Sequence, residues 1–359
     1  MKYFCLFSLF CSMFSSVAAQ DMKIQGRVSA SMQKKIGESY CYLKKLASGE
    51  KADSCKLDGN TFTFHIPDVV SKEPMSIVPL DVMLVSEPGS LNISEENQLS
   101  GTPLNEMWNL YLLEKKTYSK RFNREYQETR NDISLSRFQK EGLLKSMNEE
   151  FEATLKSRAL NYMRRNLDSP LNTLALLDYM PRINKVSTFD QVYVFSSRET
   201  QRCPDVVKMT SRMEKLRRTS VGEFYTDFTV PAGNLDGSEA KLSDYVGRGK
   251  YILVDFWASW CGPCLREAPF LKKAYEIYHG ERFDILSVAV KDKREDTRKA
   301  IEEQAYTWNQ IYESGAIASE TYGFNTIPQI MLFAPDGKIL ARGLRGDGIL
   351  NELEKYLNK

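Results

Sequence analysis

The segment "DFWASWCGPCLREAP", residues 255–269, joins the end of an apolar run to a helical pattern. Cys261 and Cys264 are three residues apart, so in a helix that begins at this pair both side chains fall on one face, close enough to form a disulfide. The free backbone N–H groups and the positive dipole end at a helix N-terminus stabilise a thiolate. The segment therefore predicts a redox-active cysteine pair where a strand meets a helix.

Two other uses of such a pair fit this sequence less well. A zinc site normally needs further Cys or His ligands, and His65 and His279, the chain's two histidines, have no ligand spacing around them. A purely structural bridge between residues three apart would remove little chain entropy from the unfolded state. We therefore expect no metal and no cofactor other than the redox-active disulfide Cys261–Cys264.

Strand and helix patterns alternate through the C-terminal part of the chain. Strands are expected at 251–256, 283–290 and 329–334, with a last strand ending at Gly343 after the turn "PDGK" (335–338). Helices are expected after Cys261, over 294–305 and from about 348. This alternation predicts an α/β domain over residues 222–359, whose sheet contains parallel strands and is covered on both faces.

The preceding residues have two different patterns. Short β runs broken by turns, such as 40–43, 62–66 and 82–85, predict a β-rich domain over residues 20–101. Apolar residues at helical spacing, including Met107 and Trp108 on one face, predict a helical region with a linker over residues 102–221. With 49 basic and 47 acidic residues, the chain's basic clusters are interpreted as solvated helix faces, and no nucleic-acid partner is expected.

Residues 1–19 have the pattern of a secretory signal peptide. Lys2 gives a basic start, an apolar run covers residues 3–14, and Val17-Ala18-Ala19 provides small residues for cleavage after Ala19. The apolar run is too short to span a bilayer comfortably, although an uncleaved anchor is the alternative. We therefore expect an exported, soluble mature chain.

Export changes how the other cysteines are interpreted, because exported chains meet an oxidising compartment. Cys41 and Cys55 would face each other if a hairpin centred near Ser48 joins their strands. Sequence does not supply the geometry that a disulfide requires, so this bridge stays open, and Cys203 is an unexplained thiol.

Residues 222–359 resemble the TlpA/ResA-like group of thioredoxin-fold thiol–disulfide oxidoreductases. The resemblance rests on "DFWASWCGPC", on "REAP" after it, on "TIPQ" (326–329) and on the "PDGK" hairpin. Residues 22–110 and the helices after them resemble, more loosely, a β-rich domain of unknown function found ahead of such modules in Gram-negative envelope proteins. "DGNTFTF" and "SGTPLNEMW" carry that likeness. The resemblance places the mature protein in the periplasm.

The resemblance implies roles for five residues. Cys261 is the nucleophile and Cys264 the resolving cysteine. Asp255 matches the buried acid of thioredoxins, which accepts the proton of the resolving thiol; the alternative is a structural acid at a strand end. Pro328 matches a cis-proline that exposes the backbone of Ile327 to an extended substrate segment, unless it merely starts a strand.

Three further side chains have a double interpretation. Trp260 is the better candidate for a docking surface, whereas Trp257 is expected to pack in the core. Glu267 fits a Glu-x-Pro pattern of the group and could tune the reduction potential, or it could be a solvated helix glutamate.

The Gly-Pro dipeptide between the cysteines is that of thioredoxin, whose reduction potential is about −270 mV, whereas strongly oxidising proteins of this fold have potentials of about −120 mV. This favours a reductase of envelope protein disulfides, including those of apocytochrome c in cytochrome c maturation. A reductase in an oxidising compartment needs a membrane electron donor, which becomes the second expected partner.

Two alternatives stay open. A thiol peroxidase shares this fold, but its motif places Pro seven and Thr three residues before the reactive cysteine, where this chain has Val254 and Ala258. Alternatively, residues 20–218 could carry the main role as a binding protein of the cell envelope, with the redox domain assisting.

Overall fold

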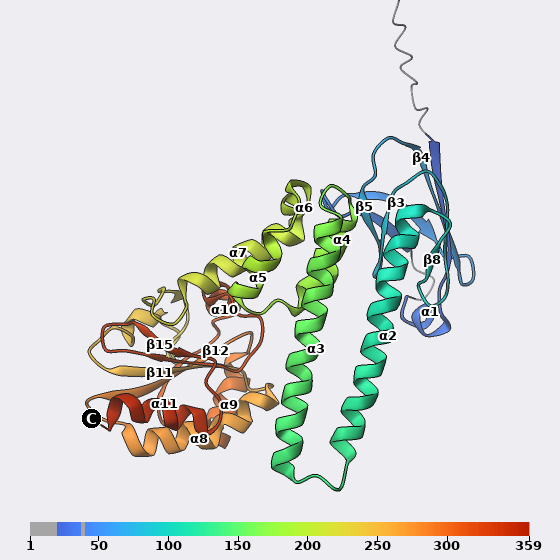
Figure 1. Ribbon diagram of the computed structural model, residues 1–359. Helices are drawn as coiled ribbons and strands as arrows, with labels where there is room; N and C mark the ends of the chain where they lie inside the picture. The colour runs from blue at the N-terminus through green and yellow to red at the C-terminus, as the bar shows by residue number, and fades with distance from the viewer. Residues whose placement is uncertain (1–19, 37–39, 359) are drawn as a thin grey trace, which may run out of the picture. The chain divides into compact units, whose positions relative to one another are not determined.

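The computed structural model describes residues 20–36 and 40–358 (Figure 1). The predicted signal peptide, residues 1–19, lies outside the described residues. Within the described ranges, no helix combines the length and apolar character needed to cross a membrane.

The chain divides into two compact units. The first comprises the described residues up to Ile183 together with Gln191–Val206, and the second comprises Asn184–Asp190 together with the residues from Val207 on. This compact unit therefore includes helical residues that precede the thioredoxin-like domain, which is expected from residue 222. Helix packing accounts for this, because the Arg212 guanidinium donates hydrogen bonds to the Gly323 carbonyl (3.0 Å) and to Asn325 Oδ1 (3.2 Å).

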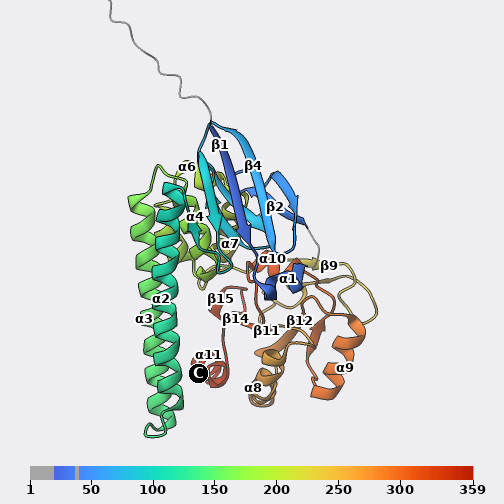
Figure 2. The same ribbon diagram turned by 90° about the vertical axis from the view of Figure 1, so that its right-hand side faces the viewer.

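The first unit contains two four-stranded sheets, ordered β4-β1-β7-β8 and β3-β2-β5-β6. Figure 2 shows β1 and β4 side by side. The elements are β1 (Gln20–Arg27), α1 (Ala30–Ile36), β2 (Tyr40–Lys45), β3 (Lys51–Lys56), β4 (Thr61–Val69), β5 (Pro74–Val78), β6 (Val82–Val85), β7 (Gly89–Ile93) and β8 (Leu99–Ser100). The β-rich prediction is confirmed. The sequence suggested β3 only through the hairpin centred near Ser48, because "KADSCK" itself shows no apolar alternation.

Helices follow the strands, as expected. Two long helices, α2 (Pro103–Asn131) and α3 (Arg137–Arg165), run side by side as an antiparallel hairpin (Figure 1). The shorter ones are α4 (Leu171–Tyr179), α5 (Val186–Tyr193), α6 (Arg198–Arg202) and α7 (Pro204–Arg218). Trp108 is fully buried, whereas Met107, expected on the same face, is 46% exposed. One residue turns a helix by about 100°, which carries Met107 away from the face of Trp108.

The second unit is built on a five-stranded mixed sheet, ordered β13-β12-β11-β14-β15. Its strands are β11 (Tyr251–Trp257), β12 (Phe283–Ala289), β13 (Asn309–Ile311), β14 (Gln329–Phe333) and β15 (Ile339–Arg342), with a small β9 (Thr229–Val230) and β10 (Ala240–Lys241) pair beside it. The helices are α8 (Gly262–Tyr278), α9 (Arg294–Gln304), α10 (Ile317–Tyr322) and α11 (Asp347–Leu357). β11 is parallel to β12 and antiparallel to β14, so the predicted α/β thioredoxin-like fold is confirmed.

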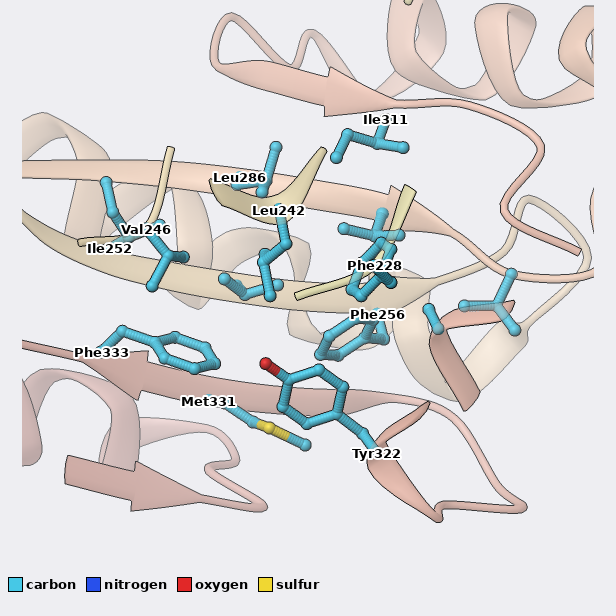
Figure 3. Close-up of a cluster of buried hydrophobic side chains, with 14 of the residues drawn as sticks. Phe228, Leu242, Val246, Ile252, Phe256, Leu286, Ile311, Tyr322, Met331 and Phe333 are labelled. Atoms are coloured by element: carbon cyan, nitrogen blue, oxygen red, sulfur yellow. The ribbon is translucent and has the colours of Figure 1, made fainter. Parts of the chain in front are cut away.

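The central strand β11 separates two cores, because successive side chains of a strand point to opposite faces. Ile252, Val254 and Phe256 join the cluster in Figure 3, where aromatic side chains such as Tyr322 and Phe333 gather on one face of the sheet. Leu253 and Trp257 point to the other face, where they pack with α8 and α11 residues. Asp255 shares this second face by alternation, and the second face also contains both cysteines of the motif.

A substitution at Gly323 can test how tightly α7 packs in the second unit. Gly323 ends α10 with φ of 68°, and an added Cβ would lie 2.9 Å from the Arg212 carbonyl oxygen and 3.0 Å from the Leu216 nitrogen. Gly315 also has positive φ (53°), but its Cβ would meet nothing within 4 Å. Left-handed backbone costs each alanine about 1–2 kcal/mol. We expect Gly323→Ala to lower the free energy of unfolding by about 1 kcal/mol more than Gly315→Ala, because backbone must also move.

Urea unfolding of the full chain, followed by tryptophan fluorescence, measures this difference. Three of the four tryptophans, at positions 257, 260 and 308, belong to the second unit. Equal losses for the two variants would contradict close packing of α7 at Gly323.

Candidate active site

The cysteine pair lies where β11 turns into α8. The backbone leaves β11 at Trp257 and turns through a hydrogen bond from the Cys261 N–H to the Ala258 carbonyl (3.1 Å). Cys261 is the N-cap of α8, and its Sγ accepts the Cys264 N–H at 3.2 Å. The two sulfurs form a disulfide with Cα atoms 5.2 Å apart. Both cysteines are buried, at 3% and 2% exposure, so a reacting partner must reach them from the adjacent surface.

Hydrogen bonds hold the loop before the cysteine pair against the loop that follows β12. The Asp292 carboxylate accepts hydrogen bonds from the Ser259 backbone N–H (2.7 Å) and from the Ser259 hydroxyl (2.9 Å). The Trp260 indole N–H donates to the Lys291 carbonyl at 3.1 Å. Although this bond holds the ring at its nitrogen, Trp260 is 63% exposed. An aromatic surface is therefore held in a fixed place beside Cys261, whereas Trp257 is fully buried in the core.

Asp255 is a buried carboxyl group in the centre of the sheet. It is 2% exposed and lies opposite Ser287 of β12 and Ile330 of β14. The Ser287 hydroxyl donates to its Oδ2 at 3.4 Å, and within the described part of the chain its Oδ1 has no hydrogen-bond partner. Burial raises the pKa of Asp255 to about 7; the Ser287 hydrogen bond only partly opposes this. The group can therefore hold or release a proton near neutral pH.

Aromatic rings enclose this part of the core. Trp257 and Tyr306 meet edge to face with ring centroids 5.4 Å apart, and Tyr306 stacks on Trp308 at 4.5 Å. The Trp308 indole N–H donates to the Ser287 hydroxyl at 2.9 Å, which orients that hydroxyl toward Asp255. These rings exclude water from the carboxyl group, and this desolvation disfavours its charged form.

Two charged residues from other elements act on Asp255. Glu267 of α8 is half-buried and accepts the Gly346 backbone N–H at 2.7 Å; its charge raises the pKa of Asp255. Arg345, from the loop before α11, lowers that pKa. Arg345 also donates to the Pro328 carbonyl. Glu267 is thus tied to the loop before α11 rather than simply solvated.

The Ile327–Pro328 peptide bond is cis and lies directly before β14. Ile327 is half-buried and packs against both cores of the second unit. The structure places Ile327 and Pro328 in the same domain as the cysteine pair, and Arg345 links their loop to the surroundings of Asp255.

Sequence reasoning missed three residues of this site. Ser287 carried a signal, because it is the one hydroxyl inside the apolar run "FDILSVAV". Trp308 and Arg345 carried none, because their distance along the chain from Asp255 hides their proximity in the fold. Within the described residues, no group of three or more His, Cys, Asp or Glu side chains is arranged to hold a metal ion.

Comparisons with known proteins concern the C-terminal part of the chain. Residues 221–342 match the AhpC/TSA family. The thiol–disulfide oxidoreductase ResA of Geobacillus thermodenitrificans is 32% identical over 120 residues, which is 33% of this chain and 67% of that protein. ResA of Bacillus thuringiensis is 25% identical over 145 residues, 40% of this chain and 81% of that protein. The resemblance drawn from the cysteine motif is thereby confirmed for this part.

Solved structures include similar chains. The thioredoxin domain of a thiol–disulfide oxidoreductase from Bacteroides vulgatus is 36% identical and covers 39% of this chain and 99% of that chain, with a TM-score of 0.35. A thiol–disulfide oxidoreductase from Bacteroides fragilis is 29% identical and covers 38% of this chain and 100% of that chain, with a TM-score of 0.35.

The raised pKa of Asp255 makes stability depend on pH. An ordinary aspartate ionises near about pH 4, so between about pH 4 and 7 the unfolded chain has lost this proton while the folded chain keeps it. The stabilisation is complete below about pH 4 and is lost as pH rises through about 7. Relative to Asp255→Asn, we expect the natural chain to lose about 1.4 kcal/mol of unfolding free energy per pH unit over this range.

Urea unfolding of both proteins at pH 4 to 8 measures the effect, with the variant as the control for all other titrating groups. A difference that stays constant across this range would mean that the folded carboxyl group ionises at its ordinary pKa.

Proposed function

Because this chain belongs to the family of thiol–disulfide oxidoreductases that includes ResA, we propose that it is an exported reductase of protein disulfides. The observation that carries the proposal is the Cys261–Cys264 disulfide at the N-terminus of α8, with the buried carboxyl group of Asp255 on the same side of the sheet. A cysteine pair with a proton acceptor nearby supplies what dithiol–disulfide exchange requires.

The reaction begins from the reduced pair. The Cys261 thiolate, stabilised by the N-terminus of α8, attacks one sulfur of a partner disulfide, and the partner's other sulfur leaves as a thiolate. A mixed disulfide now joins Cys261 to the partner. Cys264 loses its proton and attacks Cys261 Sγ, which restores the Cys261–Cys264 disulfide and releases the partner with two thiols. Two electrons pass from the pair to the partner.

Asp255 takes the Cys264 proton in this second step. A pKa of about 7 keeps a substantial share of the carboxyl groups ionised at neutral pH, and Oδ1 has no hydrogen-bond partner among the described residues. A base with a pKa near the operating pH combines availability with driving force. Ser287 and Trp308 act as positioning residues, because their hydrogen bonds orient the carboxyl group.

The partner docks beside Trp260 and along the backbone of Ile327. Trp260 offers a large exposed aromatic surface next to Cys261. Ile327 precedes β14, so an extended partner segment can align with its backbone as an added strand. Because Arg345 binds the Pro328 carbonyl, the loop that presents Ile327 is fixed in advance.

The signal-peptide pattern of residues 1–19 supports a location in the periplasm. The substrates there are disulfide-containing envelope proteins, including apocytochrome c during cytochrome c maturation. Each turnover oxidises the Cys261–Cys264 pair, and the surroundings do not re-reduce it. A membrane protein that passes electrons outward is therefore the second partner.

Trapping identifies the substrates. Cys264→Ala removes the attack that releases the partner, so mixed disulfides through Cys261 should accumulate in cells, whereas Cys261→Ala removes the nucleophile and should trap none. Acid quenching, non-reducing gels and mass spectrometry of the adducts measure this. Absence of any Cys261 adduct from Cys264→Ala would contradict dithiol exchange with envelope proteins.

The reduction potential tests the direction of electron flow. We expect equilibration of the full chain with glutathione buffers to give a value near that of thioredoxin, about −270 mV, at the Cys261–Cys264 pair. Quantified alkylation of the Cys261–Cys264 peptide reports this pair alone. A potential above about −180 mV would rule out the reductase assignment and leave an oxidase or isomerase.

A further inference from the structure

A second pair of cysteines lies in the hairpin of β2 and β3 in the first unit. The strands are antiparallel, and Cys41 is directly opposite Cys55; both are free thiols. Opposite residues in antiparallel strands point to the same face, with Cα atoms about 4.5 or 5.5 Å apart according to their place in the ladder. Both separations lie within the range of about 4.4–6.8 Å found in disulfides. The hairpin therefore already meets the distance requirement for a bridge.

The two sulfurs have different surroundings. Cys41 is fully buried, and burial with the nearby Cys55 sulfur raises the pKa of its thiol to about 11. Cys55 is partly exposed on the edge strand β3. Burial and Asp53 raise the pKa of Cys55, whereas a hydrogen bond from the Thr63 backbone N–H to its sulfur lowers it. An external disulfide therefore reaches Cys55 first, because Cys55 is the more exposed sulfur, and Cys41 lies directly opposite it on the neighbouring strand.

We propose that Cys41 and Cys55 form a second dithiol–disulfide couple, which closes a covalent bridge across the β2–β3 hairpin by exchange with an external disulfide. The Cys55 thiolate attacks one sulfur of that disulfide and displaces the other as a thiolate. Cys41 then loses its proton and attacks Cys55 Sγ, which expels the second thiolate. Two electrons and two protons leave the hairpin, and the external disulfide is reduced to two thiols.

The bridge would fasten an edge strand to its neighbour. In the sheet ordered β3-β2-β5-β6, β3 pairs with β2 alone. Oxidation would therefore hold the edge strand against local opening, which makes the first unit responsive to the redox state of its compartment.

Cys203 provides an internal control. It is fully buried, and its sulfhydryl donates to the Leu46 carbonyl at 2.9 Å rather than facing a cysteine across a strand pair. The same reagent should therefore leave Cys203 as a thiol.

The test uses the full natural chain at pH 8.5, where more thiolate forms, in buffers of oxidised and reduced glutathione. The sample is quenched in acid, alkylated in urea and digested with trypsin. We expect loss of both alkylatable thiols of the hairpin and the appearance of peptide 36–44 joined to 52–56, two hydrogens lighter than the reduced peptides. Peptide 203–208 should stay alkylated. As a second readout, hydrogen exchange of β3 should slow in the oxidised chain.

Single variants test the order of attack. In Cys41→Ser, with Cys41→Ala as a second form, Cys55 should accumulate as a mixed disulfide with glutathione, whereas in Cys55→Ser the buried Cys41 should remain a thiol. Persistence of both thiols in the natural chain under these buffers, or glutathione adducts without the joined peptide, would overturn the proposal. The result is independent of the direction of electron flow at Cys261–Cys264, because each pair is read from its own peptides.

Discussion

The burial of one carboxyl group constrains the second unit more than any other interaction. Asp255 lies in the central strand with strands on both sides and the core of α8 on its face, so water cannot solvate its charge. An unpaired buried charge is costly, and the protein meets this cost by raising the pKa of the group to about 7 instead of pairing it fully. The same desolvation that destabilises the anion also suits the group to the proton-accepting role proposed for it. Stability and the proposed chemistry would then depend on the same dry surroundings.

The alternation of side chains along β11 explains why the carboxyl group of Asp255 lies on the same face of the sheet as the cysteine pair. On β11, Val254 and Phe256 complete an apolar core, and Asp255 between them points to the opposite face. A shift of one residue would place Asp255 in the aromatic cluster of Figure 3 and remove it from the face that contains the cysteines. The apolar run that forms β11 thus also fixes the position of the carboxyl group.

Local patterns predicted the elements that carry the chemistry, but not their support. β11 and the start of α8 follow from an apolar run, a cysteine at the N-cap and a proline in the first turn. The Cys41–Cys55 register follows from hairpin symmetry about Ser48. Short elements such as β13 were not predicted, because a strand of three residues is too short to show an alternating pattern of apolar side chains. The roles of Arg345 and Trp308 near Asp255 were not predicted, because their contacts join segments that are far apart in the sequence. The packing of α7 on Gly323 was hidden from the sequence for the same reason, because it joins segments about 110 residues apart.

The charges around the pair act in opposite directions on its redox balance. The N-terminus of α8 stabilises the Cys261 thiolate, and stabilising the reduced form makes a pair more oxidising. Asp255, on the same face of the sheet, and Glu267, one turn after Cys264, are both acidic. Negative charge near the pair disfavours a thiolate and so favours the disulfide form, which makes the dithiol the better electron donor. Arg345 lowers the pKa of Asp255 and so favours its charged form. A thioredoxin-like dipeptide, combined with two acids in the same part of the domain as the pair, favours the electron flow proposed above, from the pair to a partner disulfide.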